Sequence, residues 1–541
     1  MLADLREYIN KWRETFFKDN NEYEFPINSG SGFKFKVKKA PIFTNVCDLN
    51  NNYPNTHNVS VSLLKLKGVQ FKEIPLLFST NNGNRTVTDI HSMRGLQNNR
   101  PYECGINAFL GNSIDLGIIS PKQEASLFYS FIQNQNNQIT KHKPDDDYII
   151  DYAGFFKTYG ICLNYPTPKD NEWVSIDEPV NEEVKGVAQQ IKQLICDSIS
   201  KINSTSHRRV IVIFIPQRWE EYTYYQIDGE SFDLHDYLKA FCAEKGIMSQ
   251  LIREKTIKDF NQKCQIHWWL SLSFFVKSFR TPWILANADN TTAFAGLGYS
   301  IDSKKDSKGH IVLGCSHIYS SSGEGLKFKL SRISNDKIQW RHKKPHLCYD
   351  DAYEFGKNIV SLFYESMNEL PKRIVVHKRT FFTEEEKQGI IDSISDNNKI
   401  ESIDLIEINF EDNIKYASSK IVNGKIEADG FSVSRGTCIQ LNENEALLWA
   451  HGVVPSVRNP KFNFYPGGRY IPKPLRIIKH YGIGSLEQIA NEILGLTKMN
   501  WNSLNMYSQL PVTICSSNDI ARIGKLIDSS FKHEYDYRYF I

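Results

Sequence analysis

The stretch Arg209-Val-Ile-Val-Ile-Phe-Ile-Pro216 decides the fold class of the first half of the chain. Its unbroken run of β-branched and aromatic residues is typical of a central parallel strand that is buried on both faces. A short buried strand at 114–121 and helical patterns at 122–134 and 184–201 precede it. Because strands and helices alternate, we expect an α/β domain with a doubly wound sheet. Such sheets bind ligands beyond the carboxyl ends of their strands.

The second half of the chain has a different order of elements. Segments 292–300, 310–316 and 326–330 have the patterns of successive antiparallel strands. A helix at 352–369 follows, and Lys372-Arg-Ile-Val-Val-His377 is a further buried strand. Three meandering strands, a helix and another strand are typical of RNase H-like folds.

The chain of 541 residues is too long for one compact core, so we expect two or three domains. Thr281-Pro282 interrupts the preceding element within 280–290, which is the clearest boundary. The first part combines a short helix, a strand at 33–37 and an Asn-rich loop from Asn45 to Asn58. We therefore divide the chain into a small N-terminal extension or connector, an α/β domain and an RNase H-like domain, at 1–70, 71–285 and 286–541.

Composition excludes several classes of protein. A hydrophobic fraction of 41% with 12% aromatic residues indicates globular folding, and a net charge of +3 excludes a generally polybasic nucleic-acid coat. The ten cysteines form no Cys-x-x-Cys pair, which indicates reduced thiols rather than a disulfide scaffold or a structural metal. No apolar run approaches the roughly 20 residues that span a bilayer. We expect a cytoplasmic protein that does not bind membranes.

Four polar residues have the composition of a phosphate socket. His235 and Lys239 lie one turn apart in the helical pattern 231–245, where Asp233 occupies the N-cap position. Gln250 follows the helix, and Lys277 ends an apolar run. Two cations, an amide and a helix N-terminus together suit a terminal phosphate. The alternative is that each residue alone is a solvated helix charge, a capping amide or a snorkelling lysine.

The order and surroundings of these residues resemble the MID domain of Argonaute proteins, in which an equivalent set holds the 5′ phosphate of a guide strand. Further stretches resemble other motifs of short prokaryotic Argonautes, which hold only MID and PIWI domains: Gly95-Leu-Gln-Asn-Asn-Arg-Pro-Tyr102, Trp268 to Trp283, Gly468-Arg-Tyr-Ile-Pro-Lys-Pro-Leu-Arg476 and Leu496-Thr-Lys-Met-Asn-Trp-Asn-Ser503. Arg100 stands where the family usually has glycine. The resemblance covers about 70–541 and implies a Rossmann-like MID domain followed by an RNase H-like PIWI domain.

The resemblance also implies ligands. The socket would bind a 5′-phosphorylated guide, expected to be RNA, which would pair with invading target DNA. The carboxylate of Ile541 would help a Mg²⁺ ion to bind the guide phosphate, with Arg538 neutralising charge nearby. The alternative for the aromatic C-terminal segment is a core-packing tail without a ligand role.

Slicing Argonautes use a carboxylate tetrad that clamps two metal ions. In this sequence the expected acidic positions hold other residues: Gly298, Arg379 in the segment His377-Lys-Arg-Thr380, and Asn518. Asp302 and Asp519 would each restore one ligand if the register differed, and Glu324 would imitate a further one. We expect turn and helix-cap roles for the two aspartates. The resemblance therefore implies a nucleic-acid-binding protein that does not cut, with Lys378 and Arg379 attracting phosphates rather than metals.

Two basic clusters fit the backbone of a guide–target duplex. The residues are Lys327, Lys329, Arg332, Lys337, Arg341, Lys343 and Lys344 in the first, and Arg469, Lys473, Arg476 and Lys479 in the second. Lys327 and Lys329 share one strand face, as a groove lining requires. Contacts of this kind give salt-dependent affinity that is largely independent of sequence. A solvated strand face is an equally good interpretation of either cluster alone.

The leading hypothesis is a catalytically inactive short Argonaute in antiviral and anti-plasmid immunity. The resemblance further implies a heterodimer with a separately encoded partner that carries an APAZ domain and a TIR, sirtuin-like or nuclease effector. The alternatives are an active slicer with a misaligned tetrad, and a structural subunit that has abandoned guides.

Overall fold

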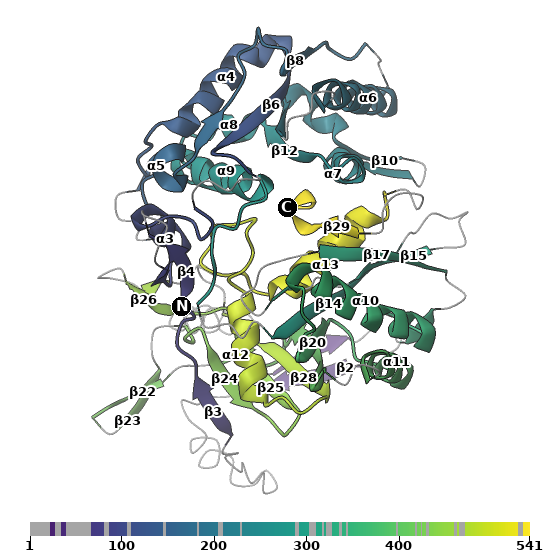
Figure 1. The fold of residues 1–541 in the computed structure, drawn as a ribbon. Coiled ribbons are helices and arrows are strands. Elements are labelled where there is room, and N and C mark those ends of the chain that lie inside the picture. The colour runs from purple at the N-terminus through teal and green to yellow at the C-terminus, as the bar shows by residue number, and fades with distance from the viewer. Residues whose placement is uncertain are drawn as a thin grey trace, which may run out of the picture.

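The computed structural model describes most of the chain from residue 66 onward, together with two short N-terminal strands. The described residues are 22–26, 34–38, 66–80, 86–104, 110–143, 148–180, 183–203, 209–227, 230–286, 291–301, 310–315, 319–320, 327–334, 338–341, 344–395, 399–416, 419–423, 425–428, 432–458, 463–464, 471–527 and 534–541. They form two lobes, one above the other in Figure 1. The predicted helix near the N-terminus and the loop from Asn45 to Asn58 lie outside the described residues, whereas the predicted strand at 33–37 is found as β2 (Lys34–Lys38), paired with β1 (Glu22–Pro26).

The first lobe is built on a parallel sheet, as predicted. Its strands are β6 (Ser113–Pro121), β7 (Cys162–Asn164), β8 (Trp173–Ile176), β9 (Val210–Ile215) and β12 (Met248–Arg253). The order is β12-β9-β6-β7, with β8 also on β6, and every pairing is parallel. All residues of β9 are buried, because helices cover both faces of the sheet.

Alternate residues of β9 face different helices. Ile211, Ile213 and Ile215 pack with α6 (Val184–Asn203) and α7 (Leu234–Glu244). Val210, Val212 and Phe214 pack in the core that contains α4 (Ala125–Gln133) and α9 (Lys263–Lys277). This period-two alternation gives the doubly wound arrangement. The short helices η1 (Lys122–Glu124), η2 (Asn134–Asn136), α5 (Phe155–Tyr159), η3 (Gln217–Tyr222) and α8 (Glu254–Lys258) complete the lobe.

The helix predicted at 231–245 is shorter than expected. It begins at Leu234, because β11 (Glu230–Asp233) pairs with β10 (Tyr224–Ile227) as a hairpin. Asp233 has an extended backbone, and its side chain accepts the N–H of Asp236 at 3.2 Å, so it is the predicted N-cap.

The second lobe contains a long mixed sheet. The strands of its first part are β14 (Thr292–Ile301), β15 (His310–Cys315), β16 (Tyr319–Ser320), β17 (Lys327–Ser334), β20 (Arg373–Lys378) and β21 (Ser402–Phe410). β14, β15 and β17 form an antiparallel meander, and β14, β20 and β21 are parallel neighbours. This is the predicted RNase H-like arrangement. The sheet continues through β28 (Leu475–Tyr481), β25 (Glu445–Trp449) and β24 (Thr437–Gln440) to β3 (Lys67–Gln70).

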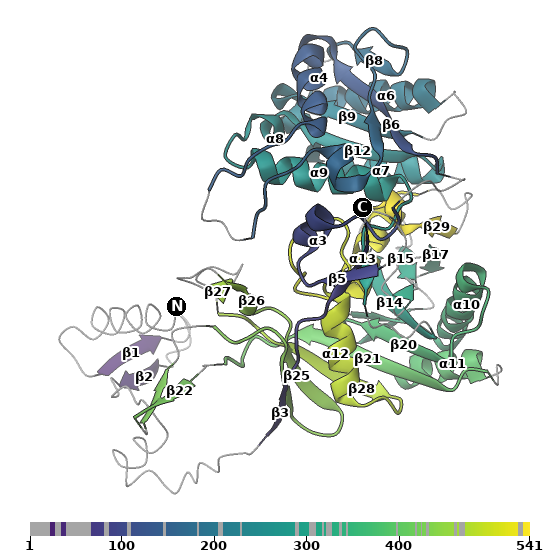
Figure 2. The ribbon, with the colours of Figure 1, turned by 60° about the vertical axis from the view of Figure 1, so that its left-hand side comes forward.

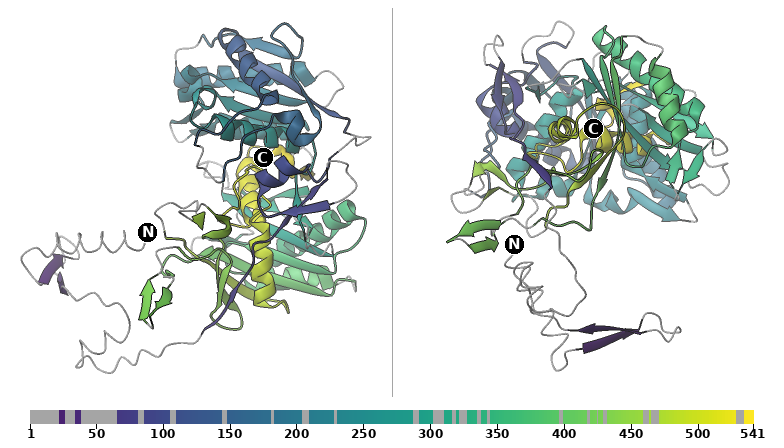
Figure 3. Two further views of the ribbon diagram at one scale, coloured as in Figure 1. Left: turned by 90° about the vertical axis from the view of Figure 1, so that its left-hand side faces the viewer. Right: turned by 90° about the horizontal axis from the view of Figure 1, so that it is seen from below.

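Helices cover both faces of this sheet as well. α10 (Tyr349–Met367) and α11 (Glu384–Ser395) pack on Ala293, Ala295 and Leu297 of β14. Phe294 belongs to the opposite core, which contains α12 (Leu486–Leu496) and α13 (Val512–Gly524). The left view of Figure 3 shows yellow and green helices on opposite sides of the sheet. Short hairpins join β18 (Gln339–Arg341) to β19 (Lys344–His346), β22 (Ser419–Val422) to β23 (Lys425–Ala428), and β26 (Val454–Arg458) to β27 (Asn463–Phe464).

The segment that precedes the first sheet packs on the second lobe. β3 adds to β24 at the sheet edge (Figure 2), and β4 (Leu76–Ser79) lies between β5 (Thr86–Asp89) and β13 (Ile284–Leu285). The side chain of Lys498 donates to the main-chain oxygens of Ile74 and Ile90, at 2.7 and 2.8 Å. The helix α3 (Ser92–Asn98) contacts both lobes: Gln97 donates to the main-chain oxygen of Asp151 at 3.3 Å, and Ser92 donates to that of Leu504 at 3.3 Å.

The C-terminal segment lies between the lobes (Figure 1). β29 (Glu534–Asp536) pairs with β17, and the 3-10 helix η5 (Tyr537–Tyr539) leads to Phe540 and Ile541, which are 6% and 5% exposed. Within the described residues, no helix is long and apolar enough to cross a membrane.

Candidate functional site between the lobes

The four predicted socket residues lie on neighbouring elements at one edge of the first sheet. His235 and Lys239 are on α7, Gln250 is in the edge strand β12, and Lys277 is the last residue of α9. At the C-terminal end of α9, the main-chain N–H of Ser278 donates hydrogen bonds to main-chain oxygens of the last turn. This cap ends the helix at Lys277, beside the same edge of the sheet.

Lys239 joins α7 to the C-terminal segment. Its ammonium group donates a hydrogen bond to the main-chain oxygen of Ser249, at 3.1 Å, and another to the main-chain oxygen of Ile541. The side chain lies deep between the lobes, since Lys239 is 4% exposed. A residue at position 541 therefore lies beside one at position 239, as the resemblance implied.

Gln250 and Lys277 form the other half of the cluster. The Oε1 atom of Gln250 accepts hydrogen bonds from the ammonium group of Lys277 and, at 2.6 Å, from the hydroxyl of Ser273. These two donors fix the orientation of the amide. Lys277 is 2% exposed.

The two ammonium groups share a site that is unfavourable for positive charge. Burial lowers the pKa of Lys239 to about 8. Burial, together with the neighbouring Lys239, lowers the pKa of Lys277 well below its ordinary value. Among the described residues, neither lysine has an Asp or Glu side chain as an ion-pair partner. A bound anion would raise the pKa of both lysines, because an opposite charge favours the charged form of a buried lysine.

His235 belongs to an adjacent group rather than to the lysine cluster. Its Nδ1 atom lies 3.2 Å from a carboxylate oxygen of Asp236, whose other oxygen accepts a hydrogen bond from Arg522 of α13. Burial alone would raise the pKa of Asp236, but hydrogen bonds from His235 and Arg522 outweigh it and lower that pKa. Within the described part of the chain, no hydrogen bond or ion pair joins His235 to Lys239, Gln250 or Lys277. The sequence prediction missed Asp236 and Arg522, and only the adjacency of Asp236 to His235 could have indicated the first.

Arg538 lies against the C-terminal segment. Its guanidinium group lies 3.1 Å from the carboxylate of Asp536 and faces the rings of Phe279 and Trp501 at 5.9 and 5.7 Å. It therefore holds the C-terminal segment in place.

Comparisons with known proteins found similarity to Argonaute proteins. No protein-family profile matches the chain. The Argonaute protein of Aquifex aeolicus is 23% identical over 362 residues, which cover 65% of this chain and 43% of that protein. The chain is homologous to Argonaute.

Solved Argonaute structures share the fold. The crystal structure of A. aeolicus Argonaute superposes with a TM-score of 0.55 at 19% identity, over 88% of this chain and 56% of that one. The Clostridium butyricum Argonaute bound to a guide DNA and a target DNA superposes with a TM-score of 0.57 at 16% identity, over 94% and 57%. The Argonaute-like chain therefore spans little more than half of these structures. Its two sheets are consistent with the predicted Rossmann-like MID and RNase H-like PIWI domains.

Of the positions expected to hold carboxylates in a slicing Argonaute, Gly298 lies in β14, Asn518 in α13, and Arg379 directly after β20. Gly298 is buried in β14, directly below the backbone of α13: a Cβ atom at this position would lie 2.5 Å from the carbonyl oxygen of Ser517 and 2.9 Å from the nitrogen of Asn518. Asn518 is exposed within α13. Asp519 is in the same helix, 3.7 Å from Arg522, and is not a helix cap. Asp302 and Glu324 lie outside the described residues.

The expectation that Lys378 attracts phosphates is wrong. Lys378 is completely buried at the end of β20, where its ammonium group donates a hydrogen bond to Glu386 of α11. His346 and Lys378 hold the pKa of Glu386 at about 2, although burial alone would raise it. Arg379 is also engaged, since its Nε atom lies 3.4 Å from Asn409 and its guanidinium group 5.4 Å from the ring of Phe410.

The basic clusters of the Argonaute-like chain differ in their surroundings. Lys473 lies 2.6 Å from Asp412, and Arg476 lies 2.7 Å from Glu445 and 3.4 Å from Glu411, so acidic partners compensate this part of the second cluster. In the first cluster, the register of β17 and β29 sets Lys327 and Lys329 opposite Asp536 and Glu534. Arg341 and Lys344 are exposed on a hairpin. Of the other predicted residues, Arg332 lies in β17, Lys479 donates to Gly484, and Lys337, Lys343 and Arg469 fall outside the described residues.

Proposed function

We propose that this protein binds the 5′-phosphorylated end of a guide strand and uses the guide to recognise complementary nucleic acid. The buried cluster of Lys239, Lys277 and Gln250 beside Ile541 carries this proposal. The carboxylate that Ile541 would carry meets Lys239, and no Asp or Glu side chain among the described residues pairs with either ammonium group, so the buried cations outnumber the negative charges around them. A terminal phosphate supplies two negative charges and several acceptor oxygens. A guide of RNA and a target of DNA remain the expected pair.

Comparison of strands that differ only at the 5′ end tests this function. We expect the purified chain to bind a 5′-phosphorylated strand at least tenfold more tightly than the 5′-hydroxyl strand of the same sequence, since one charge-assisted hydrogen bond contributes about 1.5–3 kcal/mol. RNA and DNA versions of both strands identify the guide type. Equal affinity for the phosphorylated and hydroxyl strands would remove the socket from the proposal.

The affinity for the 5′ phosphate is expected to fall at alkaline pH. The pKa of Lys239 is about 8 in the free protein against an ordinary value of 10.5, so between these values the unfolded chain binds more protons than the folded chain. The stability of the free protein should therefore rise with pH across this range. Phosphate requires the ammonium form, so its binding should weaken over the same range, by up to about tenfold per pH unit. Titrations from pH 7 to 10 check this, with the 5′-hydroxyl strand as control. A pH-independent preference for the 5′ phosphate would contradict it.

We infer that the PIWI domain does not cut the target. The close packing of α13 on Gly298 supports this inference, because a carboxylate at that point of β14 has no space. The second candidate function is an active slicer whose ligands come from other positions, for which the homology to Argonaute is the argument.

A cleavage assay separates the two candidate functions. We expect no cleavage of a labelled complementary target by the guide-loaded protein in Mg²⁺ or Mn²⁺. A product cut opposite the middle of the guide would establish the slicer instead.

The proposal includes a metal ion and a partner. Mg²⁺ prefers oxygen ligands and is commonly held by one or two protein oxygens together with substrate phosphates. The oxygen of Ile541 beside Lys239 fits this pattern and would hold the ion against the guide phosphate. The ion would supply further positive charge there.

Recognition of a target would be transmitted to a separately encoded APAZ-domain protein with a TIR, sirtuin-like or nuclease effector, giving immunity against phages and plasmids. Co-purification with the product of a neighbouring gene tests this part.

A further inference from the structure

His91 is a buried histidine at the boundary between the two lobes. It directly precedes α3, which Figure 2 shows between the lobes. His91 is 2% exposed, and its ring stacks on that of Tyr148 of the first lobe, with ring centroids 4.6 Å apart. The hydroxyl of Tyr148 donates a hydrogen bond to the main-chain oxygen of Leu504 in the second lobe. The imidazole is therefore packed against a contact that joins one lobe to the other.

The hydrogen bonds of His91 require a neutral ring. Its Nε2 atom lies 3.1 Å from the main-chain oxygen of Tyr148, which can only accept, so Nε2 carries the proton. Its Nδ1 atom accepts the main-chain N–H of Arg94 at 3.3 Å and thereby caps α3. A second proton, on Nδ1, would face this N–H group. Protonation of His91 would therefore break the cap and place a charge inside the boundary.

The charged groups around the ring also favour its neutral form. Arg94 belongs to the same segment, and Lys498 of the second lobe donates to the main-chain oxygen of Ile90, at 2.8 Å. Asp89 is the opposing charge, but its carboxylate accepts the N–H of His91 at 2.8 Å and two hydrogen bonds from Arg94, at 2.6 and 2.8 Å. Burial and Arg94 lower the pKa of His91 to about 4, although Asp89 acts in the opposite direction.

We propose that His91, Tyr148 and Leu504 form a pH-sensitive latch between the lobes, which opens when the imidazole gains a proton. In the open form, Tyr148 separates from Leu504 and water hydrates the charged ring. This device is independent of the proposed function, because it requires no bound ligand. The contact of Lys239 with Ile541 also crosses between the lobes, so the latch would control whether the lysine cluster is assembled.

The direction of the pH dependence follows from the two forms of the latch. Exposure returns the pKa of His91 toward its ordinary value of 6.5, so between pH 6.5 and 4 the open form binds more protons than the closed form. The closed form is therefore favoured above this range, and it loses up to about tenfold per pH unit as the pH falls through it. Burial lowers the pKa of His267 and His377, within the cores of single lobes, to about 3, so these two residues gain protons only at lower pH.

Small-angle X-ray scattering of the free protein between pH 7.5 and 4 tests the latch. We expect the radius of gyration of the wild-type protein to increase as the pH falls, while circular dichroism shows that both lobes remain folded. The amide of His91→Gln can donate one hydrogen bond and accept another without gaining a proton. This variant should therefore stay closed over the whole range.

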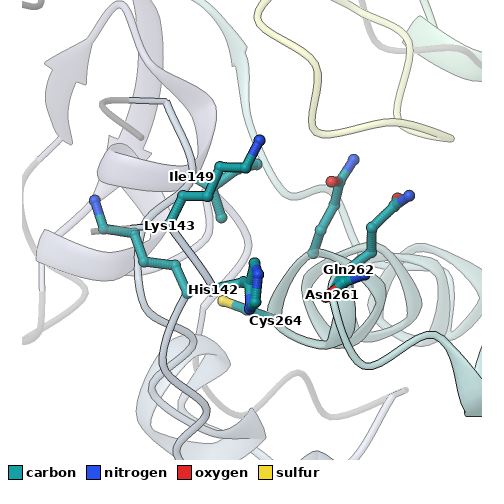
Figure 4. A pocket seen from close by; sticks show the side chains of 8 residues that line it. His142, Lys143, Ile149, Asn261, Gln262 and Cys264 are labelled. Atoms are coloured by element: carbon teal, nitrogen blue, oxygen red, sulfur yellow. The ribbon is translucent and has the colours of Figure 1, made fainter. Parts of the chain in front are cut away.

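Two further variants complete the experiment. Tyr148→Phe removes the hydrogen bond to Leu504 and keeps His91, so it should open at a higher pH than the wild-type protein. His142→Gln is the matched control, since His142 is an exposed histidine of the first lobe that lines the cavity shown in Figure 4. It should open with the wild-type pH dependence.

Three results would overturn the latch. The first is a wild-type radius of gyration that stays constant down to the pH at which circular dichroism shows unfolding. The second is a His91→Gln variant that opens with the wild-type pH dependence. The third is a Tyr148→Phe variant that opens at the wild-type pH, which decides the matter even where His91→Gln does not fold. None of these results depends on whether the protein binds a 5′ phosphate.

Discussion

Replacing Lys239 and Lys277 together by alanine is expected to reduce the affinity for a 5′-phosphorylated guide by about 1,000-fold. Each lysine would contribute a charge-assisted hydrogen bond of about 1.5–3 kcal/mol to the phosphate, and every 1.4 kcal/mol changes the affinity tenfold. Both lysine side chains are nearly inaccessible to water, so water cannot replace the hydrogen bonds that the phosphate loses in the variant. Titration of the purified variant with phosphorylated and hydroxyl strands measures the effect.

Lys245, which directly follows α7, provides the control for this prediction. Lys245→Ala removes an exposed lysine that packs over the ring of Phe241, at 4.9 Å, and should leave the preference for the phosphate unchanged. Lys277→Met keeps the length and packing of the side chain without its charge, so a fold defect cannot imitate the expected loss. If the double variant still prefers the phosphorylated strand by the wild-type factor, the phosphate is bound elsewhere.

Gly298→Asp is expected to destabilise the second lobe by more than about 3 kcal/mol and to give no slicing activity. A Cβ atom at residue 298 would lie within 3.0 Å of backbone atoms of Ser517 and Asn518, which cannot move without displacing α13 from the sheet. Overpacking of this kind costs typically 1–3 kcal/mol, and a buried carboxylate without partners adds to it. The midpoint of urea unfolding, followed together with a cleavage assay, measures both effects.

A glycine elsewhere in the same sheet provides the comparison. In β3, a Cβ atom on Gly68 would meet only the carbonyl oxygen of Cys438, at the ordinary distance of 3.5 Å. Gly68→Ala should therefore shift the unfolding midpoint little, while Gly298→Ala should shift it strongly. A folded Gly298→Asp variant that cuts target in Mg²⁺ would show that α13 can withdraw, and the inference of an inactive PIWI domain would fall.

Local sequence patterns predicted the individual elements well. The β-branched run at 210–215 could only be buried between two layers of helices, and it became the central strand β9. The N-cap at Asp233 was readable because capping depends on residues three positions apart. The start of α7 was misplaced, because the hairpin of β10 and β11 draws 230–233 into a strand through contacts that no helical pattern reveals.

The roles of charged residues were predicted less well. Lys378 was expected to face phosphates, but Glu386 from α11 holds it in the core. Arg476 was predicted to contact the backbone of a duplex, and the structure adds that Glu411 and Glu445 lie beside it. In each case the partner comes from a different strand or helix, so the local sequence around the cation carries no sign of it.

The sequence by itself determined the succession of strands and helices and the residue types of the socket, because these depend on neighbours within a few positions along the chain. Only the tertiary structure decided which of those residues meet. In the fold, Lys239 donates a hydrogen bond to Ile541, whereas His235 pairs with Asp236, which also accepts a hydrogen bond from Arg522. The tertiary structure also set the backbone of α13 against Gly298. The physical reason is that burial, and the partner that makes burial of a charge tolerable, are properties of segments brought together from distant parts of the chain.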